Sequence, residues 1–159
     1  MPGEVMHYSD REVALLKDEG GKSALVDQGL PREHLLFAAA DHLTVHSIEG
    51  WGTMLRLGEV GDGDDLYVKA DSGAVVTVSA ADGAVWRVNR GIREFLESLA
   101  IFELNYPFYV LNADLSERET AVEMLRHALS HSDSTSLLED PGFWNSVLFD
   151  VGVGDYAEE

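Results

Sequence analysis

Glu123, His127 and His131 form the strongest candidate metal site in the sequence. They are spaced four residues apart, so on a helix they share one face. Two imidazoles at positions i and i+4 can bind a divalent ion. This face, however, lies opposite the apolar residues of the same segment, and no glutamate follows the first histidine as in HExxH zinc enzymes. We therefore expect a solvated helix face, without a metal or another cofactor.

A hydrolytic site is the second possibility. His42 and His46, with Asp41 or Ser47 beside them, are residue types found in catalytic triads. Triads are assembled in space, so closeness in sequence carries little weight. The sequence contains neither a GxSxG nucleophile motif nor a cysteine. We expect no catalytic residues and no enzymatic activity.

Asp62, Asp64 and Asp65 lie in a glycine-rich acidic loop. The pattern resembles a calcium loop but lacks the glutamate at position 12 and the flanking helices of an EF-hand. No lysine follows, and the aspartates would repel a phosphate. We expect a solvated turn that faces a basic protein partner, with Trp51, between two glycines, as a candidate aromatic anchor. The alternative is that Trp51 is buried or half-buried.

Composition limits the classes of protein that this chain can be. Its 159 residues, 45% of them apolar, are enough for one domain with a core, so residues 1–159 are expected to form a single domain. Eleven Lys and Arg residues against 29 Asp and Glu residues give a net charge of −18, which disfavours nucleic acid and anionic membranes as partners. No apolar run is long enough to cross a membrane, and no secretory signal is recognisable. The absence of cysteine suits a cytoplasmic protein.

Alternating apolar residues and tight-turn signals predict a meander in the middle of the chain. Glycine-containing turns at 71–73 and 82–83 precede two Val-rich segments. The fold class is therefore α+β: a mostly antiparallel meander of four to six strands packed against helices. The expected strands are Leu43–Ile48, Thr53–Val60, Leu66–Ala70, Ala74–Ser79 and Ala84–Val88, with a further short strand at Ala24–Val26.

Helices are predicted at both ends of the meander. Ser9 and Ser116 begin capping boxes, Asn89 is a helix cap, and Asp140-Pro141 is a typical helix start. Leu96 and Trp144 lie on the apolar stripes of their helices and are expected to be buried. Residues 130–136 are polar enough for a loop, and 155–159 are expected to be a frayed tail.

Several segments, taken in order, resemble the SUKH superfamily, specifically its fourth group of immunity proteins. The superfamily also contains yeast cell-wall synthesis regulators. The resemblance is strongest over residues 25–152. The segments that carry it are Gly29-Leu30-Pro31, Leu55-Arg56-Leu57-Gly58, Asp71-Ser72-Gly73-Ala74-Val75, Val85-Trp86-Arg87-Val88-Asn89, Phe95-Leu96-Glu97-Ser98-Leu99 and Asp140-Pro141-Gly142-Phe143-Trp144. The chain departs from the family at Arg90-Gly91, where a serine is more typical.

The resemblance implies a bacterial antitoxin that binds and blocks a cognate polymorphic toxin, such as a nuclease or deaminase. It carries over no catalytic residues. The acidic chain is expected to be a monomer or weak dimer whose partner is a basic toxin domain. The alternatives are an enzyme or small-molecule-binding domain whose site is assembled only in space, and a regulatory scaffold without a toxin partner.

The expectation that no metal supports the fold can be tested with a chelator. EDTA should leave the melting temperature unchanged, because no strong metal motif is present. A loss of several degrees would instead point to a metal held by Glu123, His127 and His131, and alanine variants of the two histidines would then melt like the chelated protein.

Overall fold

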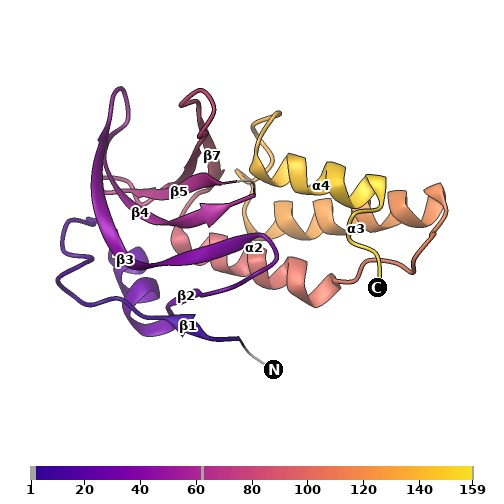
Figure 1. Cartoon of the computed structure of the whole chain (residues 1–159), viewed down its shortest axis with the longest axis horizontal. Helices are drawn as coiled ribbons and strands as arrows, with labels where there is room; N and C mark the ends of the chain where they lie inside the picture. The colour runs from indigo at the N-terminus through magenta and orange to yellow at the C-terminus, as the bar shows by residue number, and fades with distance from the viewer. Residues whose placement is uncertain (1–2, 62, 159) are drawn as a thin grey trace. The chain divides into compact units, whose positions relative to one another are not determined.

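The computed structural model describes residues 3–61 and 63–158. The chain divides into two compact units, Met1–Phe95 and Leu96–Glu159, and each is described by itself. Figure 1 shows the strands of the first unit in indigo to magenta and the helices of the second in salmon to yellow.

The first unit is built on a five-stranded antiparallel meander, which confirms the predicted α+β class. Neighbours in sequence are neighbours in the sheet throughout. A small separate pair joins β1 (Val5–Met6) to β2 (Leu30–Pro31). The meander strands are β3 (Phe37–Ile48), β4 (Gly52–Val60), β5 (Asp64–Lys69), β6 (Val75–Val78) and β7 (Val85–Asn89).

Both faces of the sheet are apolar. On one face, the cross-strand neighbours Leu55, Val68 and Val75 are all 0% exposed. On the opposite face, Met54 and Val76 are also 0% exposed and form a cluster with Tyr67. Antiparallel sheets commonly solvate one face, so two buried faces require that something cover the second one.

The segment before the sheet differs from the prediction. The Ser9 capping box forms its hydrogen bonds, with Ser9 N–H donating to Glu12 over 2.9 Å, but residues 10–15 make turns rather than a helix. The helix α1 (Glu19–Ser23) begins later, capped by Asp18, and η1 (Ala24–Gln28) is a π-helix where a strand was predicted. Lys17 N–H donates to the carbonyl of Ala70, so the sheet holds the chain extended at the point where the predicted helix would continue.

Asp18 also explains why a glycine is needed in a distant turn. Gly73 has φ +77°, and a Cβ there would lie 2.6 Å from the Asp18 carboxylate. The same carboxylate accepts a hydrogen bond from Gly21 N–H at the start of α1. A side chain at position 73 would therefore disturb the turn and the helix cap together.

Helix α2 (Ile92–Asn105) starts in the first unit, where Phe95 contacts Phe37 edge-on with ring centroids 5.4 Å apart. The second unit contains the rest of α2, α3 (Leu115–Ser132) and α4 (Phe143–Val153). Helices α3 and α4 pack side by side (Figure 1). The buried residues of these two helices are Ala121, Leu125, Leu129, Trp144, Val147, Leu148 and Val151.

Three predicted boundaries in this unit are wrong. Asp114, not Ser116, caps α3, because its carboxylate accepts from Glu117 N–H. Gly142, not Asp140, caps α4, because Asn145 donates to the carbonyls of residues 137 and 139 and holds that loop against the helix start. The expected loop at 130–136 is helical up to 132 and then continues with the buried residues Asp133 and Ser136.

Residues 155–158 make regular contacts, in contrast to the expected frayed tail. Glu158 N–H donates to the carbonyl of Tyr109 over 2.9 Å, and Tyr109 forms a bridge with Ala157. The ring of Tyr156 meets Phe102 edge-on at 5.0 Å. The described part of the tail therefore packs against the loop that follows α2.

The two helix residues that were expected to lie in the core differ in how far they are buried. Trp144 is 0% exposed, as predicted, whereas Leu96 is only half-buried. Trp144→Ala should lower the free energy of unfolding by about 3–5 kcal/mol, and Leu96→Ala by clearly less, because the cost follows the buried volume that is lost. Urea denaturation measures both. Equal losses for the two variants would contradict these helix faces.

Candidate functional site

The acidic turn between β4 and β5 is tied into the sheet. Asp62 lies outside the described residues. Asp64 accepts a hydrogen bond from Ala80 N–H over 3.0 Å, which joins this turn to the next hairpin. Asp65 accepts from Arg56 Nε over 2.8 Å. Both aspartates are half-buried, so part of their charge is already compensated inside the protein.

Trp51 covers the second apolar face of the sheet. It lies in the turn between β3 and β4, is half-buried and packs against the cluster of Met54, Tyr67 and Val76. Two cations flank its ring: Lys69 Nζ is 5.4 Å and Arg87 Cζ is 5.9 Å from the centroid. The exposed part of the indole is thus held in place beside positive charge, as in cation–π pairs.

The described candidates Trp51 and Asp64 lie beyond opposite ends of β4. Trp51 precedes the first residue of β4, and Asp64 follows the turn after its last residue. A nine-residue strand separates them by about 26 Å, at about 3.3 Å per residue. Trp51 and the acidic turn are therefore two separate surfaces at opposite ends of the sheet.

Each of the histidines singled out in the sequence contacts one or more nearby side chains. His127 and His131 stack on the exposed face of α3 with centroids 6.4 Å apart, and Glu123 pairs with Arg126. Among the described residues, no three His, Cys, Asp or Glu side chains converge closely enough to hold a metal ion. In the first unit, His42 Nδ1 lies 3.3 Å from Glu12 and His46 Nε2 lies 2.8 Å from Thr44 Oγ1. His42 and His46 therefore have different side-chain partners.

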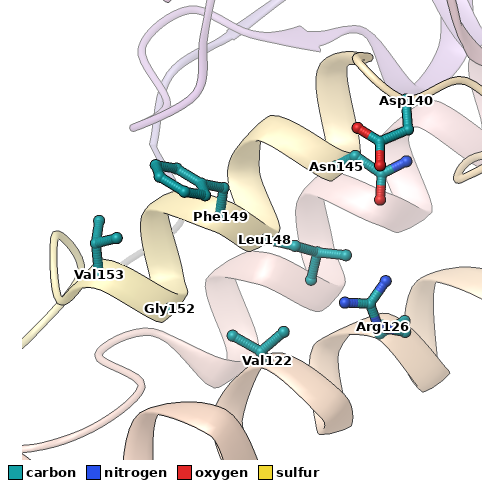
Figure 2. Close-up of a pocket in the computed structure, with 8 residues that line it drawn as sticks. All are labelled: Val122, Arg126, Asp140, Asn145, Leu148, Phe149, Gly152 and Val153. Carbon is teal, nitrogen blue, oxygen red and sulfur yellow. The ribbon is translucent and has the colours of Figure 1, made fainter. Parts of the chain in front are cut away.

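A groove between α3 and α4 is a candidate site that the sequence patterns did not reveal (Figure 2). It encloses about 440 Å³. On its α4 side, Phe149 is 69% exposed and Val153 is 48% exposed. The residues that line it are Val122, Arg126, Asp140, Asn145, Leu148, Phe149, Gly152 and Val153.

One sequence signal could have pointed to this groove. Helix α4 carries Phe149 and Val153 in addition to the buried stripe that includes Trp144 and Leu148. A helix that is apolar on more than one side is expected to be buried on more than one side. Because the core uses only one of these sides, the second is left facing solvent.

The net negative charge is concentrated in the second unit. From residue 96 onward the sequence has two basic residues, Arg118 and Arg126, against thirteen aspartates and glutamates. Burial raises the pKa of Asp150, and the nearby charge of Asp155 raises it further. The second unit is therefore more strongly negative than the first, which contains nine of the eleven basic residues.

A family model described as SUKH-4 immunity protein matches residues 2–150. The chain belongs to the SUKH-4 immunity protein family. The match extends over both compact units and confirms the resemblance drawn from the sequence. No curated protein and no solved structure matches the chain. SUKH-4 proteins are immunity proteins, a class that is generally non-enzymatic and acts by binding a toxin.

Within residues 3–61 and 63–158, no helix combines the length and the apolar character needed to cross a bilayer.

The carboxylate of Glu12 accepts hydrogen bonds whose strength in this SUKH-4 chain depends on pH. The hydrogen bond from Ser9 N–H lowers the pKa of Glu12 below its ordinary 4.5, partly offset by burial, and Leu43 N–H, Ser9 Oγ and His42 lower it further. A lowered pKa in the folded state means that ionised Glu12 stabilises the protein above pH 4.5, and that this contribution is lost as the pH falls through the folded-state pKa.

The stability difference between the parent and Glu12→Gln should therefore shrink on acidification from about pH 7 to pH 3. Urea denaturation at several pH values measures it, with Glu33→Gln as a control for an exposed carboxylate. A difference that stays constant over this range would show that ionised Glu12 has no role in stability.

Proposed function

We propose that this chain is a bacterial immunity protein that binds a cognate polymorphic toxin in the cytoplasm and neutralises it by occlusion. The family match over residues 2–150 is the observation that carries this proposal. The net charge of −18 supports a basic partner such as a nuclease or deaminase domain, because opposite charges speed association. The chain acts as a stoichiometric blocker and catalyses no reaction of its own.

Stoichiometric action distinguishes this function from catalysis. Co-expression with the toxin domain encoded by the neighbouring gene should restore growth and yield a stable complex. In a titration, toxin activity should fall linearly with added chain and reach zero at a fixed molar ratio. Toxin that stays fully active at excess chain would contradict the proposed function, and loss of activity at a small fraction of the toxin concentration would indicate an enzyme.

The acidic turn contributes to association in this proposal. Asp64 and Asp65 lie at one end of the meander, and Asp62 precedes them in the sequence. Clustered charge acts mainly on the association rate. Trp51, at the other end of β4, is a separate contact. Because Trp51 also covers Met54, the binding test for it is Trp51→Phe, which retains an aromatic cover over the apolar cluster.

Replacing all three turn aspartates with asparagine should slow association with the toxin and flatten its salt dependence. Asparagine retains an oxygen that can accept from Ala80 N–H, so little unfolding is expected. A control triple variant, Asp10→Asn, Glu33→Gln and Glu49→Gln, removes the same charge from exposed sites elsewhere in the first unit. Stopped-flow rates between about 50 and 300 mM salt measure the effect. Equal rates for the two triple variants would exclude a specific role of the turn.

A further inference from the structure

The groove between α3 and α4 has an open apolar floor. Leu148, which is 3% exposed, and Val122 line it from the two helices, as Figure 2 shows. Gly152 contributes only backbone: a Cβ at this position would lie 3.4 Å from Val122 Cγ2. The missing side chain therefore leaves room between the helices that a larger residue would fill.

Phe149 and Val153 form the apolar wall of this groove. They are four residues apart on α4, so they lie on the same side of the helix. Moving the large exposed area of the phenyl ring out of water is energetically favourable. Helix α4 is about 16 Å long, which suits two to three turns of a second helix laid along it.

The charges around the groove select the partner. Arg126 is the one cation among the described lining residues, and its Nε lies 3.2 Å from Glu123. Asp140 lies at one end of the groove, and Glu119 is exposed on α3 one turn before Glu123. Carboxylates therefore flank an apolar groove in a unit that has no lysine.

This combination fits a basic amphipathic helix. Helix-in-groove recognition uses apolar side chains at i, i+3 or i+4 and i+7, which enter a hydrophobic groove, and charges on the flanks add specificity. A second copy of this chain carries the same net charge of −18 and would be repelled. Nucleic acid would be repelled for the same reason.

We propose that the α3–α4 groove docks a basic amphipathic helix of the toxin, with Phe149 and Val153 as the apolar contacts and Glu119, Glu123 and Asp140 as the acidic flanks. This inference rests on the proposed immunity function. It adds a surface in the second unit to the surfaces suggested by the meander.

A synthetic peptide tests the groove without the toxin. The probe is a helical 15-residue peptide of Leu and Lys in amphipathic order, compared with a peptide that has Glu in place of Lys. In NMR titrations of the full-length ¹⁵N-labelled chain, the Lys peptide should shift amides of α3 and α4 around Val122 and Phe149, and the Glu peptide should not. Shifts confined to other elements, no shifts, or equal binding of both peptides would overturn the proposal.

Matched variants then test the apolar wall. Phe149→Ser should weaken Lys-peptide binding by about tenfold or more, as expected for an aromatic hot spot. Met124→Ser is the control, because Met124 is 63% exposed on α3 outside the groove lining. Both positions are exposed, so folding should persist, and circular dichroism checks it. Equal affinity of the two variants would overturn the proposal.

Growth rescue in cells that express the toxin distinguishes failure of the groove proposal from failure of the proposed immunity function. If the parent and Met124→Ser rescue growth and Phe149→Ser does not, the groove is the docking site. If all three rescue equally, the inference is overturned and the immunity function stands. If the parent itself fails to rescue, the immunity function is overturned, and with it the inference. Sedimentation of a parent dimer that Phe149→Ser abolishes would identify a self-interface instead and overturn the proposed occupant.

Discussion

Burial of both faces of β4 is the constraint on which the first unit depends. Met54 and Leu55 are adjacent, point to opposite faces and are both 0% exposed. A strand of this kind must lie inside a sheet with cover on each side, so β3 and β5 pair with it along its length. The cover over Met54 includes Trp51, and this structural task limits how far the indole can serve a partner.

Local signals predicted the meander well because its turns are local. The expected strand Thr53–Val60 is β4 to within one residue, and the glycine turns lie where Gly73 and Gly83 require positive φ. Helix starts were predicted less well, since several residues can cap one helix. The Ser9 box forms but starts no helix, because Lys17 N–H donates to the carbonyl of Ala70 and the chain is held extended there. Only the packed structure shows that Asp18 caps α1 instead.

The candidate surfaces were harder to predict than the fold. Aspartates near a glycine indicate a solvated turn, but the partners of Asp64 and Asp65 are distant in sequence and follow from strand register. Leu96 lies at helical spacing with Phe95 and Leu99, yet only the packing decides that it is half-buried. The groove forms only because α3 and α4 are adjacent, and no local sequence pattern predicts that adjacency. Two signals in the sequence could have pointed there: the apolar residues on a second side of α4 and the excess of acids after residue 96.

The two kinds of surface suit different steps of binding. Exposed charge acts at a distance, so the acids of both units raise the rate at which a basic partner arrives and are weakened by salt. Apolar contact acts only at close range and mainly slows dissociation. The free chain carries self-repulsion from thirteen acids against two bases after residue 96, which lowers the stability of the folded state. A basic helix bound in the α3–α4 groove would both reduce that repulsion and cover Phe149. Toxin binding and stability of the second unit are therefore thermodynamically linked under the proposed function.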